Sequence, residues 1–503
     1  MQPNKMDTVD FRNKNILAPM VRIGQLTTRL QALRYGADLV YSEEVIDYRM
    51  LRTKRVENNV TGTVDFIEDD GTIAFQTHQD EKGKVVFQMG TADAKRAVAV
   101  AKKIENDVAA IDINMGCPKE FSIKGGMGAA LLTQPEKVRE ILSELVKNIR
   151  IPITCKIRVL PDLDDTLKLV KLIESTGVTA LGVHGRTREE RPRHHNRNDV
   201  IQKIAETIGI PVIANGGSQS IKKYEDIEKF RRATGASSVM IARAAQWNTS
   251  IFRKEGMLPV VDVIKSYLKL AIKLDNAFCN IKYNVQQLYH QNMESPDGYA
   301  LMHSSDIRDI CVIWGLGDYY EMHKIKKNID VSTVPINKRK LEDGEELYEL
   351  ALCFQRKNKR SKVSPRANLF NYVKKNPHLG KLDYKTTQQG RFFRSVLTLN
   401  KKKYSSTVWQ KNKKSAEQSA AAICLYALGY YDGSEDCPLM APTKDTGHEN
   451  TIIGNTDDEK SPDNCDKLKD EVIAINDGIS ITKENHSNSK VILKSESALT
   501  TTS

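Results

Sequence analysis

The segment AAIDINMGCPKEFSIKGGMG, residues 109–128, carries the strongest structural signal in the chain. It begins with an apolar run that is typical of a buried strand. Pro118 then prevents a helix from continuing through Cys117. The loop is rich in glycine, at Gly116, Gly125, Gly126 and Gly128. Because glycine lets a backbone lie close to a large flat ligand, we expect this loop to present Cys117 to a pocket.

Similar strand-like segments repeat on both sides of this one, from Asn15 to about Gly256, with helical stretches between them. The candidate strands are residues 16–20, 39–43, 85–89, 110–115, 153–158, 180–186, 211–217 and 237–243. Each is short, apolar and rich in Val or Ile, as a strand buried on both faces should be. Eight such units predict an α/β fold of the (β/α)8 TIM-barrel type. A doubly wound open sheet is the competing architecture, but the first strand lacks a GxGxxG motif after it.

Reactive side chains stand at the carboxyl ends of these strands. They are Glu43, Gln88, Asn114, Lys156 with Arg158, His184, Asn215 and Arg243. The carboxyl ends of barrel strands converge on one face, so the pattern predicts that these residues form a single pocket. The alternative is that each is a solvated loop residue, which is plausible for one position and poor for all of them together.

The last two strands indicate what the pocket binds. They end in Asn215-Gly216-Gly217 and Ala242-Arg243. The loops after strands seven and eight of a barrel commonly form a phosphate site, and an arginine there adds a bidentate contact. This suggests a mononucleotide, FMN, with its ring over the barrel mouth. A barrel that binds a metabolite phosphate without a flavin is the alternative.

Three further strand-end residues suit an isoalloxazine ring. Lys156 would face the ring edge that becomes negative on reduction, and Gln88 and Asn114 could hydrogen bond the ring. Cys117 is open to three interpretations: nucleophile, proton donor, or small buried hydrophobe. With an ordinary thiol pKa of about 8.5 it is mostly protonated at neutral pH, which favours a role as proton donor.

The rest of the chain divides by composition. We expect a barrel domain at 13–257, a helical domain at 258–335, a charged linker at 336–355, a basic module at 356–431, and a disordered tail at 432–503. Between Arg356 and Lys414 there are 18 Lys or Arg against one acid, Asp383. That stretch carries +17 of a net charge of +12, so the remainder is mildly acidic at −5. A polyanion is the expected partner of the basic module.

The cysteines and the apolar runs set further expectations. The 8 cysteines are scattered singly, without CxxC pairs. This pattern predicts a reducing compartment, the cytoplasm or the nucleus, and no metal site. No run reaches the length of a membrane span, so we expect none. We also expect a monomer.

Five motifs together resemble the tRNA-dihydrouridine synthase family. They are LAPMVRIG (17–24), NMGCP with K and GGMGAALL (114–132), CKIR (155–158), HGRT (184–187) and IANGGS (213–218). The resemblance covers about residues 13 to 330. The basic module makes the chain similar to the eukaryotic branch of the family, which reduces the D-loop uridine at position 20.

The resemblance implies an NADPH-dependent, FMN-mediated reduction of a uracil C5–C6 bond in tRNA. Hydride would pass from flavin N5 to C6 of an extruded uracil, and Cys117 would protonate C5. FMN would be held by Pro19, Met20, Gln88, Lys156, His184, Asn215, Gly216, Gly217, Ala242 and Arg243.

The basic module resembles a double-stranded RNA-binding domain, with the element order α-β-β-β-α between Ser364 and Tyr431. Lys413 and Lys414 at the start of its second helix would contact phosphates. Arg356, Lys357, Lys359 and Arg360 would extend the same basic strip. Two other functions remain open: a dehydrogenase of a free pyrimidine on the same fold, and a non-catalytic RNA-binding adaptor.

Overall fold

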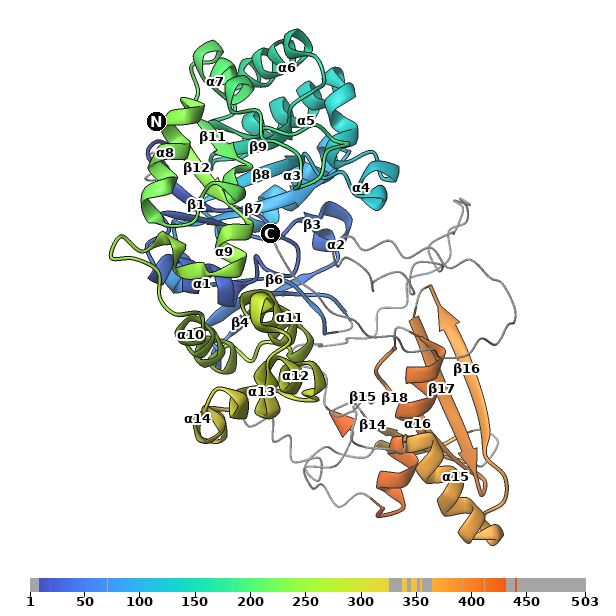
Figure 1. The fold of residues 1–503 in the computed structure, drawn as a ribbon. Coiled ribbons are helices and arrows are strands. Elements are labelled where there is room, and N and C mark those ends of the chain that lie inside the picture. The colour runs from blue at the N-terminus through green and yellow to red at the C-terminus, as the bar shows by residue number, and fades with distance from the viewer. Residues whose placement is uncertain are drawn as a thin grey trace, which may run out of the picture. The chain divides into compact units, whose positions relative to one another are not determined.

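The computed structural model describes residues 9–69, 71–324, 337–341, 345–350, 353–354, 364–390, 392–410, 412–430 and 439–440. Within these ranges the chain forms a closed parallel barrel with helices around it, a cluster of helices after the barrel, and a further domain of five strands and two helices (Figure 1). The fold class predicted from the sequence is confirmed. The predicted tail lies outside the described residues except for β19 (Leu439–Met440), which pairs with β15 (Cys353–Phe354).

Eight parallel strands form the barrel. They are β1 (Asn15–Leu17), β2 (Leu39–Tyr41), β7 (Val85–Gly90), β8 (Ala110–Met115), β9 (Ile153–Arg158), β10 (Ala180–His184), β11 (Val212–Asn215) and β12 (Ser238–Ile241). Pairings of β1 with β12 and of β2 with β7 close the ring. The predicted bounds of β8 and β9 are correct. Five other strands end two or three residues earlier than predicted, because the chain leaves the sheet where loop residues such as Pro19 begin.

Alternation along each strand separates an outer face from an inner face. In β8, Ile111 and Ile113 pack outward in the main hydrophobic cluster, whereas Ala110 faces the barrel interior. In β9, Cys155 packs outward, so Lys156 faces inward. The helices outside this layer are α1 (Leu26–Arg34), α3 (Ala94–Ile104), α5 (Pro135–Asn148), α6 (Leu163–Ser175), α7 (Asn198–Thr207) and α8 (Tyr224–Thr234).

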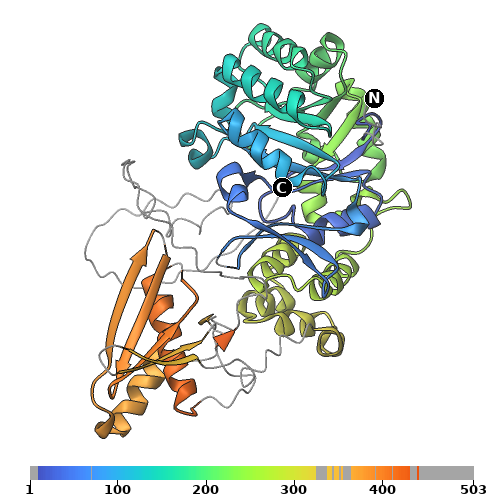
Figure 2. The same ribbon diagram turned by 180° about the vertical axis from the view of Figure 1, so that it is seen from behind.

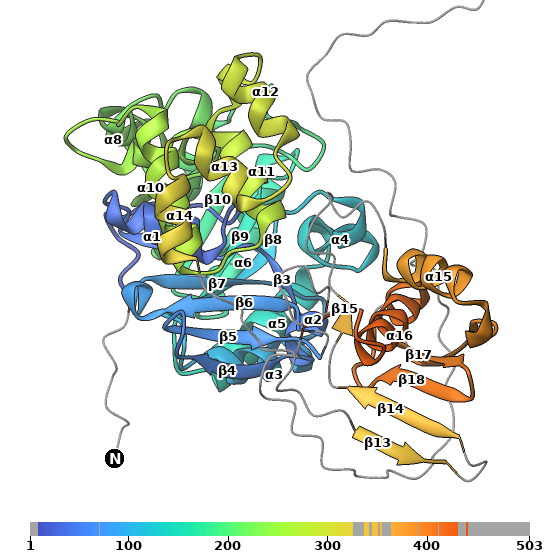
Figure 3. The same cartoon turned by 90° about the horizontal axis from the view of Figure 1, so that it is seen from below.

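The second strand–helix unit departs from the predicted repeat. After β2, the short strand β3 (Val45–Ile46) pairs with the end of β7, and α2 (Asp47–Leu51) follows. The strands β4 (Lys54–Asn58), β5 (Thr63–Ile67) and β6 (Ile73–His78) then form an antiparallel sheet of their own (Figure 3). The sequence analysis assigned no structure to this segment.

A buried ion pair joins this insertion to the barrel. Arg29 of α1 donates through Nε and Nη2 to the carboxylate of Glu81, at 2.8 and 2.7 Å. The two side chains are only 2% and 0% exposed. Arg29 also donates to the carbonyls of Gly24 and Gln76. This one guanidinium therefore links the loop after β1 with the inserted sheet.

The region predicted to be helical contains α10 (Val260–Lys273), α11 (Phe278–Leu288), α12 (Pro296–His303), α13 (Ile307–Ile313) and α14 (Gly317–His323) (Figure 2). These helices share a core around Tyr267 and Trp314. They contact α1 of the barrel through a leucine cluster consisting of Leu26, Leu30, Leu270 and Leu274. A buried hydrogen bond of 3.2 Å from Thr28 to Asn284 crosses the same boundary.

The C-terminal domain has the predicted order, with α15 (Pro365–Lys375), β16 (Asp383–Gln389), β17 (Phe392–Leu399), β18 (Lys402–Ser406) and α16 (Lys413–Ala427). The alanine face of α16 packs on Leu397 and Leu399. The prediction that 336–355 is only a linker is wrong for its described part. Strands β13 (Asn337–Lys340) and β14 (Glu346–Leu350) extend this sheet, because β14 pairs in parallel with β18. The many charges between 336 and 355 hid the alternating pattern of β14.

Replacing Arg29 with alanine should reduce the free energy of unfolding by about 3–5 kcal/mol, because Glu81 would remain buried and unpaired. Urea unfolding followed by circular dichroism measures the loss. Arg34→Ala is the matched control: Arg34 lies on the same helix but is half exposed and 3.9 Å from Asp80, so it should cost at most about 1 kcal/mol. Equal losses in the two variants would contradict the role assigned to the pair.

Candidate functional site

The barrel register brings the predicted strand-end residues to one end of the ring. Asn114 pairs in register with Lys156, and His184 pairs with both Arg158 and Asn215. The outward packing of Ile113, Ile157, Val183 and Ala214 leaves these neighbouring polar residues on the inner face. The predicted convergence of the strand ends is therefore present in the structure.

Asn114 shapes the turn that carries Cys117. Its Oδ1 accepts hydrogen bonds from the backbone N–H groups of Gly116 and Cys117, at 3.0 and 3.1 Å. The carbonyl of Cys117 then accepts from the N–H of Ala129 at 3.0 Å. Cys117 is partly exposed. The thiol is thus held at the mouth by a turn that closes back on itself.

Two glycines of this loop are required by the packing of the loop itself. Gly128 has a φ of 57°, and a Cβ there would lie 2.7 Å from the carbonyl oxygen of Cys117. At Gly125 a Cβ would lie 2.8 Å from the methyl group of Met127. The sequence suggested that these glycines admit a flat ligand. In the structure they let the loop fold tightly against itself.

Of two adjacent glutamates, the second is the one beside Cys117. Glu43, which was predicted to face the pocket, accepts a hydrogen bond of 2.8 Å from the backbone N–H of Arg22 and so fastens the loop after β1. Glu44 instead interacts with the side chains of Asn114 and Cys117. Burial raises the pKa of Glu44 to about 7. The sequence analysis missed Glu44, since only the pairing of β3 with β7 places it there.

Inside the barrel, Asp112 organises the polar residues below the mouth. Its carboxylate accepts from Gln88 Nε2 at 2.9 Å and from Thr154 Oγ1 at 2.7 Å. Burial raises the pKa of Asp112 to about 6, opposed by these hydrogen bonds and by the charge of Lys156. Burial and then Arg158 lower the pKa of Lys156 to about 8. Gln88 is therefore oriented by Asp112, with its carbonyl oxygen left over for another partner.

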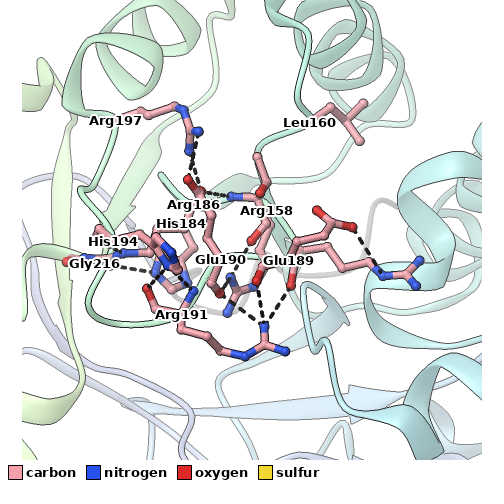
Figure 4. A network of polar contacts seen from close by, with 12 residues as sticks. Arg158, Leu160, His184, Arg186, Glu189, Glu190, Arg191, His194, Arg197 and Gly216 are labelled. Atoms are coloured by element: carbon pink, nitrogen blue, oxygen red, sulfur yellow. Dashed lines mark hydrogen bonds and ion pairs between the residues drawn. The ribbon is translucent and has the colours of Figure 1, made fainter. Parts of the chain in front are cut away.

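His184 lies in a strongly positive environment. Its pKa is well below its ordinary value, first because of burial and then because of the charges of Lys156, Arg158, Arg186 and Arg243. Arg186 Nη1 lies 3.1 Å from His184 Nε2 and 3.0 Å from the carbonyl oxygen of Gly216 (Figure 4). A guanidinium can only donate, so Nε2 accepts and His184 is neutral. Arg186 belongs to the HGRT motif, but the sequence analysis gave it no role.

Arg158 joins the Cys117 loop to the loop after β10. It donates through Nε to the carbonyl of Gly116 at 2.9 Å and through Nη1 to the carbonyl of Thr187 at 2.8 Å. Glu190 in the same loop pairs with Arg197, which holds the pKa of Glu190 down at about 2 (Figure 4). The guanidinium of Arg158 therefore holds the backbone of both loops in position at the mouth.

Around β11, glycine is required by packing. Gly216 has a φ of 112°, and a Cβ there would lie 2.0 Å from Asn196 Oδ1. At Gly217 a Cβ would lie 2.7 Å from the ring of Phe230. The side chain of Asn215 is buried and donates to the carbonyl of Met240 at 2.9 Å. The side-chain N–H of Asn215 is thus used within the protein, and the short helix η3 (Gly217–Gln219) follows the strand.

The remaining predicted residues lie on the first and last units of the barrel. Pro19 and Met20 are half buried in the loop after β1, where the carbonyl of Met20 accepts from Gly24 N–H at 2.7 Å. Ala242 and Arg243 follow β12, and the guanidinium of Arg243 lies over the ring of Trp247 at 5.8 Å. Both segments therefore stand at the same end of the barrel as Lys156 and His184.

The structure describes only two of the six residues that were predicted to bind RNA. Lys413 and Lys414 are exposed and are the first two residues of α16. The side chain of the N-cap residue, Asn412, accepts a hydrogen bond from the N–H of Ser415 at 2.8 Å. The four residues predicted to extend the strip lie outside the described residues. They are Arg356, Lys357, Lys359 and Arg360.

Taken together, the fold and its mouth define a (β/α)8-barrel protein with a thiol and several cations at the carboxyl ends of its strands, joined to a basic module with the order α-β-β-β-α. Residues 16–294, more than half of the chain, match the family model described as dihydrouridine synthase. The chain belongs to the dihydrouridine synthase family. Residues 365–428 match the double-stranded RNA binding motif, in agreement with the α-β-β-β-α order.

Named relatives share the barrel region. A Schizosaccharomyces pombe protein named tRNA-dihydrouridine(20) synthase (NAD(P)+) is 41% identical over 295 residues, which cover 56% of this chain and 61% of that protein. A Saccharomyces cerevisiae protein of the same name is 38% identical, covering 56% of this chain and 78% of that protein. A mouse protein named tRNA-dihydrouridine(20a/20b) synthase (NAD(P)+)-like is 30% identical, covering 55% and 82%. This chain thus spans less than two thirds of the Schizosaccharomyces pombe relative.

Two features of the described residues bear on other classes of site. No group of three or more His, Cys, Asp or Glu side chains in the described ranges is arranged to hold a metal ion. Among the helices that the structure describes, none has both the length and the apolar character needed to cross a membrane.

Gly216→Ala should lower the free energy of unfolding by about 1–3 kcal/mol, because alanine at a φ of 112° is strained and its Cβ would overlap Asn196. Chemical denaturation measures the difference. Gly209→Ala is the control, since a Cβ there would meet only Glu174 Oε1, at 3.5 Å. A Gly216 variant as stable as the Gly209 variant would refute the packing argument.

Proposed function

We propose that this protein reduces the C5–C6 double bond of a D-loop uridine in tRNA, at position 20, with NADPH as reductant and FMN as bound cofactor. The family match and the names of the two yeast relatives support the reaction and the position. The observation that carries the proposal is the position of the Cys117 thiol at a barrel mouth lined by cations. The RNA-binding domain favours tRNA over a free pyrimidine as substrate.

The residues at the mouth suit FMN. A phosphate is dianionic at neutral pH, and the charges of Lys156, Arg158, Arg186 and Arg243 already act together on His184. The cations on β9 and in the segments that follow β10 and β12 therefore supply an environment for a bound anion. The carbonyl oxygen of Gln88, left over by its bond to Asp112, offers an acceptor for a ring N–H.

We assign the cofactor contacts by position. Lys156 and Gln88 would face the flavin ring, with Pro19 and Met20 beneath it. His184, Arg243 and the chain from Gly216 would hold the ribityl phosphate. When bound and reduced by NADPH, FMN supplies the hydride for uracil C6. The remaining predicted contacts, Asn215, Gly217 and Ala242, would act by shaping the backbone around the phosphate.

Cys117 provides the proton. Burial, followed by the negative charge of Glu44, raises the pKa of Cys117 above its ordinary value. The group is therefore a thiol at neutral pH and can donate to C5 as negative charge develops there. The Asn114 turn fixes the thiol at the mouth, and Arg158 holds the adjacent Gly116 carbonyl. These contacts keep the donor in place while the base enters.

The RNA-binding domain supplies affinity that a barrel mouth lacks. Domains of this type recognise the shape and backbone of A-form RNA over about 16 base pairs, with little sequence preference. Lys413 and Lys414 are exposed and suitably charged for phosphates. A uridine in a loop can be extruded at low cost, so binding to neighbouring helical RNA is compatible with reduction of an unpaired base.

Cys117→Ala should retain its flavin absorbance and lose tRNA reduction by about 100-fold or more, because general acid catalysis contributes about 10²–10⁴. Dihydrouridine formed in tRNA under NADPH is the measurement. Cys279→Ala, which removes an exposed thiol on α11, is the control and should keep full activity. Normal turnover by the Cys117 variant would exclude the assigned role.

Replacing both Lys413 and Lys414 with alanine should weaken tRNA binding about tenfold or more at physiological salt, since phosphate contacts dominate affinity. The dependence of affinity on salt concentration should become shallower, and the flavin spectrum should not change. The control replaces Lys374 and Lys375, two exposed lysines at the end of α15 in the same domain. Equal weakening by both double variants would show a general charge effect instead of a contact at α16.

A further inference from the structure

The loop between β10 and α7, residues 185–197, borders the mouth and is rich in arginine. It contains five arginines against two glutamates. Arg158 places this loop beside the segment that carries Cys117. Its guanidinium bridges the carbonyl oxygens of Gly116 and Thr187, at 2.9 and 2.8 Å. A single side chain therefore separates the turn that holds the thiol from the arginine-rich loop.

The loop 185–197 contains no helix or strand, but side chains hold its backbone at several points (Figure 4). The guanidinium of Arg186 donates to the carbonyl of His194 at 2.8 Å, and Gln219 of η3 donates to the carbonyl of Pro192 at 2.8 Å. The N–H of Arg191 donates to His194 Nδ1 at 2.8 Å, and its carbonyl accepts from the N–H of His194 at 3.0 Å. The fold of the protein itself therefore holds this loop in place.

Three of the five arginines make their contacts within the protein. Arg186 is only 2% exposed. Arg197 pairs with Glu190, as described above. The guanidinium of Arg191 folds back over the loop and donates to the carbonyl of Glu189 at 3.1 Å (Figure 4). These three side chains therefore stabilise the conformation of the loop.

The other two arginines, Arg188 and Arg193, are exposed to solvent. Arg188 lies 3.8 Å from Glu189, and an exposed pair at that distance contributes little. Among the described residues, none forms a hydrogen bond or an ion pair with the side chain of Arg193. A single exposed arginine is common on any protein surface. Here two of them stand on a fixed loop next to the Cys117 segment, which favours an anionic partner at the rim of the mouth.

We propose that the loop 185–197 is a preformed contact surface for the RNA backbone beside the target base, with Arg188 and Arg193 as its phosphate-binding side chains. The inference rests on the proposed function, in which a uridine of tRNA enters the mouth. When a base is extruded into a pocket, the neighbouring nucleotides stay outside it, so their phosphates lie along the rim. Because the loop is already ordered, little conformational entropy is lost when it binds them.

This surface differs from both anion-binding regions assigned above. The cations assigned to FMN do not include Arg188 or Arg193. The C-terminal domain recognises duplex RNA by its shape, whereas a contact at the mouth meets the unpaired nucleotides around the extruded base. The two surfaces would therefore bind different parts of one tRNA, and each would add its own phosphate contacts to the affinity.

The test measures binding of an unmodified tRNA transcript to the full-length chain, without NADPH, over a series of salt concentrations. Replacing both Arg188 and Arg193 with alanine should weaken binding about tenfold at physiological salt. The slope of log affinity against log salt should become shallower by about 1.4–1.8, as expected for the loss of two phosphate contacts. Replacing both with lysine keeps the charges, so the affinity should lie between those of the wild type and the alanine variant.

A control variant and a second ligand make the test specific. Arg139 of α5 and Arg232 of α8 are exposed arginines on the outer helices of the barrel, and replacing both with alanine should leave tRNA binding unchanged. An RNA duplex of about 16 base pairs matches the length that a double-stranded RNA-binding domain spans, and it has no unpaired base. The alanine variant of Arg188 and Arg193 should bind this duplex as tightly as the wild type does.

Four results would overturn the inference. They are unchanged tRNA affinity in the alanine variant, an equal loss in the control variant, an equal loss for the duplex, and a lysine variant that binds tRNA as weakly as the alanine variant. The second and third would show a general effect of charge, and the fourth would show that charge is not the basis of the contact. Binding is measured without NADPH, so absence of tRNA reduction by the wild type would refute the proposed function without changing these binding results.

Discussion

Closure of the parallel barrel is the constraint on which the rest of the structure depends. When β1 pairs with β12 and β2 with β7, eight strands that are far apart in sequence point their carboxyl ends at one opening. Alternation along each strand then turns Gln88, Lys156 and His184 inward, while apolar neighbours such as Ile157 pack outward. The hydrophobic layer under the helices therefore fixes the end of the barrel at which the polar side chains gather.

The proposed function places two requirements on the mouth that conflict in principle. Binding an anionic cofactor favours cations, but protonating a carbon requires an acid that has kept its proton. Different acids interact with the two kinds of group. Asp112 below the mouth interacts with Lys156, and Glu44 at its edge faces Cys117. Arg158 donates hydrogen bonds to two backbone carbonyls, so less of its hydrogen-bonding capacity is left for a ligand.

Much of the site was predictable because barrel geometry converts a sequence pattern into a location. Short apolar strands ending in Asn114, Lys156 and His184 were sufficient to place these residues together. The role of the glycines was harder to predict from the sequence. Gly128 and Gly216 look alike in sequence to glycines that approach a ligand, and only atomic packing shows that Cys117 and Asn196 exclude a Cβ at these positions.

The sequence by itself determined the fold class, the position of Cys117 on a loop after a barrel strand and the nature of the basic module, since periodicity, turn residues and charge are local properties. Tertiary structure alone decided that Glu44 and not Glu43 interacts with Cys117, because the pairing of β3 with β7 holds this segment at the end of the barrel. It also decided that 346–350 joins the RNA-binding sheet. Each outcome depends on which strand, distant in the sequence, pairs with the segment. The pattern of residues within the segment does not specify that partner.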